Sequence, residues 1–222
     1  MPAPYGPFSS PVLPIGSARA SVPEERVRPA LDFTVLSRLP FSYWLVVMIA
    51  AAFTIARFSD AFLILKALRS GLPTSVVPLV IVAMNLVYSV ISYPAGILSD
   101  RYGSRGQLAA GIVLLIVANV VLALSNHLPG LVAGVVLWGA HLGFTQGVLS
   151  KMVSSRAPAD MMATGFGIFN LVSGIAVLLS SLIAGLLWQQ IGMEATFIGG
   201  ALFAALAGTG MACSWRMVAG TR

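Results

Sequence analysis

Charged side chains are scarce in this sequence. Asp, Glu, Lys and Arg make up 9% of its 222 residues, whereas 58% of the residues are hydrophobic. A soluble domain carries about a quarter charged residues, so water is excluded as the solvent for most of this chain. The apolar stretches are about 20 residues long, enough to cross a bilayer as a helix, and they are continuous rather than alternating. The sequence therefore predicts an all-α membrane protein.

The sequence has a single cysteine and lacks the common motifs of soluble enzymes. The single cysteine, Cys213, excludes an internal disulfide and a metal site built from several cysteines. There is no GxxxxGK, HExxH or GxSxG pattern, so we predict no enzymatic activity, no metal and no cofactor. The basic excess, +6 in formal net charge, is not gathered on one polar module, and we expect no binding to nucleic acid.

Residues 1–40 differ in composition from the rest of the chain. They hold eight of the 13 prolines and four arginines but no long apolar run. Such a mixture cannot bury enough surface to fold alone. We expect a disordered cytoplasmic linker at 1–40, a six-span domain at 41–215 and a cytoplasmic tail at 216–222.

Six apolar spans follow the linker. Their approximate limits are Tyr43–Leu65, Thr74–Leu98, Gln107–Leu124, Leu128–Leu149, Ala163–Trp188 and Ala195–Cys213. Ten Lys or Arg residues fall on the side of both termini, and two, Lys66 and Arg69, fall in the first loop on the opposite side. The positive-inside rule then places both termini in the cytoplasm.

Two sequence features predict how the spans pack. Gly139, Gly143 and Gly147 are spaced by four in the fourth span, so one face is nearly bare and a neighbouring helix can approach closely. Pro78 and Pro94 predict a kink in the second span.

Polar side chains within the spans mark the candidate site, because each must be paired or face water. Arg57 and Asp60 are three residues apart in the first span and are predicted to share one helical face. The other candidates lie in spans two, four and five: Asn85, Tyr88, His141, Gln146 and Asn170. Spans three and six are plainer, and we expect them to face lipid while the other four line a pathway. The alternative is structural: Arg57 and Asp60 could only neutralise each other, and the rest could bridge helices.

The most specific pattern lies between the second and third spans, in the stretch Tyr93–Arg105, which we interpret as a loop. In this sequence the pattern reads Gly96-x-Leu98-Ser99-Asp100-Arg101-x-Gly103-x-Arg105. It resembles the G-x-L-a-D-R-x-G-R-R signature of the major facilitator superfamily. In that family the signature joins helices two and three on the cytoplasmic side and recurs between helices eight and nine. Ser104 departs from it, because a basic residue is usual there.

Further resemblances indicate the C-terminal half of such a transporter, helices seven to twelve. The linker resembles the segment that joins the two halves. The runs Arg57–Leu63 and Trp138–Gly147 resemble the seventh and tenth helices. Ala157–Asp160 resembles the loop before helix eleven, although the next three residues are not the usual Leu-Arg-Gly. The resemblance implies two inverted three-helix repeats.

The resemblance also implies secondary active transport of a small solute by alternating access, in a bacterial inner membrane. Arg57 would attract an anionic group. Asp60 could take up a proton when Arg57 moves away, since burial disfavours the charged carboxylate. Hydrogen bonds to the solute would come from His141, Asn85, Gln146 and Asn170.

Six spans supply only one wall of such a transport cavity. We therefore expect the chain to need a missing N-terminal six-helix half or, as a homodimer, a second copy, and to be inactive alone. Asp100 would meet the start of a helix in the opposite half, so it should lack a partner in the isolated chain. Two other classes stay open: a membrane-domain subunit of a primary pump, which would need an ATPase partner, and a non-transporting membrane scaffold.

Overall fold

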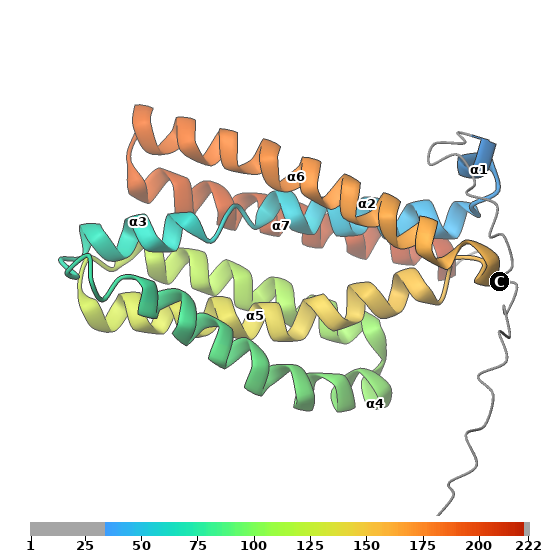
Figure 1. Ribbon diagram of the computed structural model, residues 1–222, viewed down its shortest axis with the longest axis horizontal. Coiled ribbons are helices and arrows are strands. Elements are labelled where there is room, and N and C mark those ends of the chain that lie inside the picture. The colour runs from blue at the N-terminus through green and yellow to red at the C-terminus, as the bar shows by residue number, and fades with distance from the viewer. Residues whose placement is uncertain (1–33, 220–222) are drawn as a thin grey trace, which may run out of the picture. The chain divides into compact units, whose positions relative to one another are not determined.

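The computed structural model describes residues 34–219 (Figure 1). Its helices are α1 (Thr34–Ser37), α2 (Phe41–Ala56), α3 (Ala61–Arg69), α4 (Pro78–Leu124), α5 (Leu128–Ser154), α6 (Met162–Gln190) and α7 (Met193–Ala219), with a 3-10 turn, η1 (Ala159–Met161), before α6. Most of the predicted linker lies outside the described residues, as does the end of the predicted tail. The short helix α1 falls within the predicted linker, and α7 continues into the predicted tail.

The membrane helices belong to one compact unit, residues 37–222. Its described part contains six helices long and apolar enough to cross a membrane: Phe41–Arg69, Pro78–Arg101, Gly103–Leu124, Leu128–Ser154, Ala159–Gln190 and Met193–Ala212. We number them spans 1 to 6. Span 1 consists of α2 and α3, spans 2 and 3 are the two halves of α4, and α5, α6 and α7 carry spans 4, 5 and 6. The predicted all-α architecture with six spans is confirmed.

The stretch between spans 2 and 3 is not the loop that the sequence suggested. Helix continues on both sides of Gly103, which alone has non-helical angles, with φ 78° and ψ 158°. A positive φ is open to glycine because it has no Cβ. The chain therefore reverses direction at one residue, and the polar side chains of this stretch are held on two helix ends.

Only one of the two prolines predicted to kink span 2 lies inside the helix. Pro78 is the first residue of α4, a position where the missing N–H removes no helical hydrogen bond. Pro94 is the proline inside α4.

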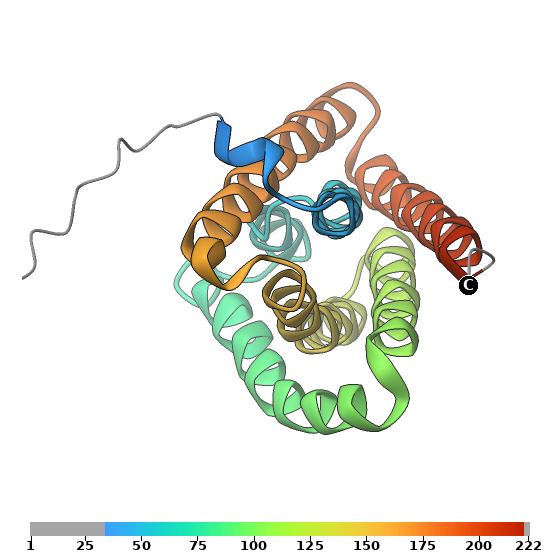
Figure 2. The ribbon, with the colours of Figure 1, turned by 90° about the vertical axis from the view of Figure 1, so that its right-hand side faces the viewer.

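Two helices lie toward the middle of the unit, and the others surround them. Figure 2, a view along the helices, shows α2 and α5 toward the middle, with α6, α7 and the two halves of α4 around them. A Cβ at Gly139 would come within 2.5 Å of the Met84 carbonyl oxygen, and one at Gly143 within 2.8 Å of Ile91. The predicted close approach to α5 is thus confirmed at these two glycines. Gly147 differs, because a Cβ there would meet nothing within 4 Å.

The packing of the unit is anchored differently at its two ends. Toward the end at His127, an aromatic cluster joins spans 1, 4, 5 and 6 through the side chains of Phe58, Phe62, Trp138, Trp188 and Phe197. At the Gly103 end, the Tyr43 hydroxyl donates to the Gly165 carbonyl at 2.7 Å, and Arg38 pairs with Asp160 at 3.2 Å. The start of span 1 is thus tied to the start of span 5.

Lys66 is not the loop residue that the sequence suggested. It lies in the last turn of α3 with an exposed fraction of 0%. Its Nζ donates to Asn126 Oδ1 at 3.1 Å, across to the connection between spans 3 and 4. A buried ammonium requires such a partner, so Lys66 ties the end of span 1 to the connection between spans 3 and 4.

Candidate functional site

Span 1 is broken where its two charged residues stand. The helix α2 ends at Ala56, Arg57 takes an extended conformation (φ −111°, ψ 92°), and α3 begins at Ala61 (Figure 1). The prediction that Arg57 and Asp60 share one helical face is therefore wrong, because four non-helical residues separate the two helices. Arg57 instead follows the C-terminus of α2 and Asp60 precedes the N-terminus of α3. Each charge has the sign that the nearby helix dipole favours.

The polar groups at the break find partners on other spans. The Ser59 N–H donates to the Ser181 hydroxyl of α6 at 3.3 Å, and the Ala61 N–H donates to the Ser59 hydroxyl at 3.3 Å. In the hydrocarbon region each unsatisfied backbone group would cost several kcal/mol. These hydroxyls therefore make the irregular backbone tolerable inside the bilayer.

The Asp60 carboxylate is held by a tryptophan that the sequence reading did not select as a site residue. Trp138 Nε1 donates to Asp60 Oδ1 at 3.0 Å, and the Trp138 ring is fully buried in the aromatic cluster. The available signal was a tryptophan in the middle of span 4 rather than at its interface. An indole has one N–H and needs an acceptor when buried, which Asp60 supplies.

The Arg57 side chain has no polar partner among the described residues. Within residues 34–219, its guanidinium takes part in no hydrogen bond or ion pair. An arginine carries five N–H donors. These N–H groups are therefore available to a ligand with acceptor oxygens.

Arg57 lines a cavity of about 170 Å³ between spans 1, 4 and 5, which we call the Arg57 cavity. Four of the predicted site residues meet there: Arg57, His141, Gln146 and Asn170. Thr54, Thr145 and Ser173 add hydroxyl groups to the lining, and Phe53, Leu149, Phe169, Gly174 and Val177 add apolar surface. Three of the four spans predicted to line a pathway, spans 1, 4 and 5, thus border this cavity.

His141 is oriented by a backbone bond. Its Nδ1 lies 2.7 Å from the Gly111 carbonyl oxygen of span 3, and its side chain is buried. A carbonyl can only accept, so Nδ1 carries the proton in this bond. In the neutral ring, Nε2 is then left as an acceptor for a donor in the Arg57 cavity.

The two predicted site residues of span 2 lie elsewhere. The Asn85 amide donates to the Ile81 carbonyl of its own helix at 2.8 Å, and its side chain is exposed. Tyr88 lines a different cavity, described next. Span 2 therefore contributes nothing to the lining of the Arg57 cavity.

The second cavity, about 270 Å³, lies between spans 2, 3 and 4 at the Gly103 end, and we call it the Asp100 cavity. Gly96 and Asp100 of the signature stretch line it, together with Lys151 of span 4. Arg101 and Arg105 are exposed near the break at Gly103.

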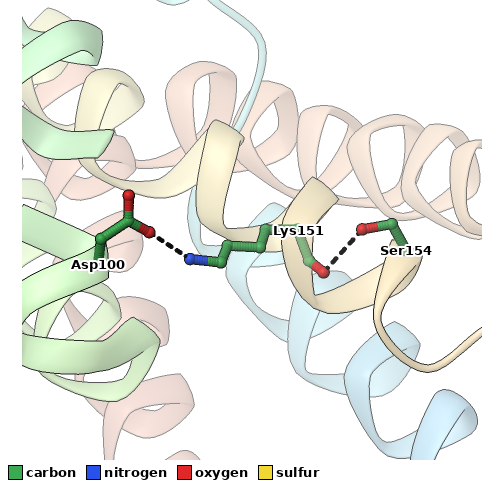
Figure 3. A network of polar contacts seen from close by, with 3 residues as sticks. All are labelled: Asp100, Lys151 and Ser154. Carbon is green, nitrogen blue, oxygen red and sulfur yellow. Dashed lines mark hydrogen bonds and ion pairs between the residues drawn. The ribbon is translucent and has the colours of Figure 1, made fainter. Parts of the chain in front are cut away.

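Asp100 is paired within this chain, contrary to prediction. Lys151 Nζ donates to Asp100 Oδ1 at 2.7 Å, and Figure 3 shows the lysine extended from α5 toward the carboxylate. The Ser154 hydroxyl in turn donates to the Lys151 carbonyl at 2.9 Å. The signal for this pair was a lysine near the end of span 4, but its partner is 51 residues away.

The match to known families accounts for this architecture. The profile of the Major Facilitator Superfamily matches residues 41–221, which include all six spans. The chain belongs to the major facilitator superfamily. Its members are transporters rather than enzymes, and the chain is an integral, multi-pass membrane protein.

Individual relatives agree with this assignment. An uncharacterized MFS-type transporter of Methanocaldococcus jannaschii is 31% identical over 179 residues, which cover 78% of this chain and 45% of the relative. The inner membrane transport protein YajR of Escherichia coli is 23% identical over 142 residues, 64% of this chain and 30% of the relative. The tetracenomycin C resistance and export protein of Streptomyces glaucescens is 29% identical over 112 residues, 50% of this chain and 21% of the relative.

A solved structure is similar in fold. The crystal structure of a POT family transporter in complex with 5-aminolevulinic acid matches with a TM-score of 0.64 at 18% identity, over 77% of this chain and 37% of that chain. At this identity the likeness concerns the fold alone. The chain spans less than half the length of these relatives and of this structure, so its six helices correspond to part of an MFS transporter.

Proposed function

We propose that this chain forms the C-terminal six-helix half, helices seven to twelve, of a secondary transporter that moves a small solute by alternating access. The observation that carries the proposal is Arg57, a cation without an ion-pair partner in the described residues, which lines a polar cavity at a break in span 1. Secondary transporters build solute and ion sites from such discontinuous helices. An ionisable group inside a span marks a functional site by default.

The lining of the Arg57 cavity suits a small solute with an anionic group. The guanidinium can hold a carboxylate or phosphate through two parallel hydrogen bonds. Gln146, Asn170 and Ser173 offer donors and acceptors to the rest of the solute, and His141 Nε2 offers an acceptor. The residues around this cavity of about 170 Å³ would form one wall of the complete site. The opposite half of the transporter would supply the other wall.

We propose that spans 2 and 5 contact that opposite half, the missing N-terminal one. In the most apolar 18 residues of each of these two spans only 17% are buried, against 33% for span 6, 50% for spans 1 and 3 and 61% for span 4. Both lie along the outside of the unit in Figure 2. Their exposed surface includes the polar residues Asn85, Ser89 and Asn170, which would be costly against lipid.

The size of the active particle tests this proposal. We expect purified chain that is strictly monomeric in detergent to show no solute uptake after reconstitution, because it has only one wall of the site. A second copy of the chain is the other arrangement that would complete the wall, and native gels with cross-linking distinguish it by size. Uptake by a strictly monomeric chain would contradict the proposed half-transporter.

Proton coupling through Asp60 is part of the proposal. Its carboxylate already accepts a hydrogen bond from Trp138, and it stands three residues from Arg57. We expect Asp60→Asn to abolish uptake driven by a pH gradient in the assembled transporter while solute exchange continues, because the amide cannot carry the proton. Trp138→Phe is the matched control, since it removes the hydrogen bond and keeps the carboxyl group. Unchanged pH dependence in Asp60→Asn would exclude this role.

We further propose a bacterial inner-membrane location with the Gly103 end in the cytoplasm, and residues 1–40 as the linker between the two halves. The support is the placement of Lys and Arg, ten of which fall on the side of both termini. Labelling of a cysteine introduced by Ser155→Cys in a Cys213→Ser background tests the orientation. If an impermeant reagent added outside intact cells labels this cysteine, the orientation is the opposite of the one proposed.

A further inference from the structure

The Asp100 cavity has no part in the proposed Arg57 site, yet it is larger and equally polar. It is lined by three glycines, by Val148 and by the polar residues Tyr88, Ser92, Ser99, Asp100, Gln107 and Lys151. The helix α5 separates it from the Arg57 cavity. Thr145 of α5 lines one cavity and Gly147 the other, and residues two apart on a helix point about 200° from each other.

Two buried oxygens that line the Asp100 cavity have no hydrogen-bond partner within the described residues. They are Ser99 Oγ and Gln107 Oε1, in side chains that are 5% and 4% exposed. A buried polar atom left unsatisfied costs about 1–3 kcal/mol. Both oxygens come from the helix ends around Gly103, so this wall of the cavity holds two oxygens that can still accept a hydrogen bond.

The cavity is also left open by its neighbours. A Cβ added at Gly96 or at Gly147 would meet nothing within 4 Å, whereas one at Gly143 would clash with Ile91 of span 2. The glycine at position 147 is therefore not required for close helix packing, and it enlarges the space beside the two oxygens.

The oxygens at the cavity can take up a ligand that donates hydrogen bonds. Lys151 forms an ion pair with one oxygen of the Asp100 carboxylate, as Figure 3 shows. The Asp100 carboxylate has further lone pairs. Together with Ser99 Oγ and Gln107 Oε1 it offers three acceptor groups, and an ammonium group has three N–H donors.

We propose that the Asp100 cavity is a second binding site, for a small solute that carries an ammonium group. The ammonium donates to Gln107 Oε1, Ser99 Oγ and the Asp100 carboxylate, and the rest of the solute occupies the space beside Gly147. This site is independent of the proposed Arg57 site and of the anion expected there.

The experiment measures binding of ethanolamine to the purified full chain in nanodiscs, by calorimetry and by the shift in melting temperature. Acetate and glycerol are the comparison probes, because they lack an ammonium. Gly147→Leu fills the Asp100 cavity, and Gly174→Leu is its matched control, since a Cβ at Gly174 also meets nothing within 4 Å but faces the Arg57 cavity. We expect Gly147→Leu to weaken ethanolamine binding about tenfold or more, because the leucine side chain takes the space of the solute, and Gly174→Leu to leave it unchanged.

A second variant covers the case in which Gly147→Leu does not fold. Gln107→Leu removes a buried unsatisfied oxygen, so the ligand-free protein should keep or raise its melting temperature while ethanolamine no longer raises it further. Ethanolamine binding that survives either variant would overturn the proposal. Equal binding of acetate or glycerol, or no binding of ethanolamine to the unchanged chain, would overturn it as well and would leave water as the occupant.

Discussion

Replacing Arg57 by glutamine is expected to weaken binding of a small carboxylate by about 30-fold or more, which corresponds to about 2 kcal/mol. The guanidinium lines the Arg57 cavity, and no hydrogen bond or ion pair within the described residues involves it. Glutamine keeps a polar side chain but loses the charge and the planar pair of donors. The measurement is calorimetric titration of the purified chain with a panel of small mono- and dicarboxylates.

The stability of the same variant separates a binding role from a structural one. Removing a half-buried charge that has no ion-pair partner should leave the melting temperature of the ligand-free protein unchanged or higher, because the cost of desolvating the charge outweighs its favourable place at the end of α2. Arg57→Lys should retain part of the affinity, since lysine keeps the positive charge but lacks the planar pair of N–H donors. Arg69→Gln is the control, because Arg69 is exposed at the far end of the same span. A lower melting temperature in Arg57→Gln with unchanged binding would identify a structural arginine.

A second large effect is expected on stability, from the glycine face of α5. We expect Gly139→Ala to destabilise the protein by about 1–3 kcal/mol, the usual range for overpacking. The added methyl would lie 2.5 Å from the Met84 carbonyl oxygen, a backbone atom that cannot rotate away. The helix α5 and the first half of α4 would have to move apart along their contact.

Gly147→Ala, eight residues along the same face, is the matched control. Its methyl meets nothing within 4 Å, and alanine favours a helix over glycine by up to about 1 kcal/mol. Thermal melting of both variants in the same detergent should therefore give shifts of opposite sign. Equal shifts would mean that the glycines act through helix propensity rather than through close packing.

Much of the architecture could be predicted because lipid imposes simple rules. A span needs a continuous apolar run, and the runs in this chain locate all six spans. The spacing of Gly139 and Gly143 predicted a contact that the structure contains. Four of the seven predicted pathway residues border one cavity because spans 1, 4 and 5, on which they lie, pack side by side around it.

The break in span 1 could not be predicted from the sequence. Residues 57–60 contain neither proline nor glycine, the usual causes of a helix break. The break depends instead on partners from distant spans, the Ser181 hydroxyl and the Trp138 indole. Likewise, Asp100 was expected to lack a partner because only its family role was considered, whereas Lys151 of span 4 reaches it. Side-chain pairs between spans depend on how the helices rotate and pack, which periodicity alone does not determine.

The break in span 1 also has a consequence for how the protein is made. Span 1 leaves the ribosome before the other five, and its Arg57 and Asp60 are each costly at the centre of a bilayer, by about 2.5–3.5 kcal/mol on insertion scales. Asp60 bonds to a residue 78 positions later, and Ser59 to one 122 positions later. Span 1, the earliest of these six spans to be synthesised, therefore reaches its final conformation only after spans 4 and 5 have been inserted beside it.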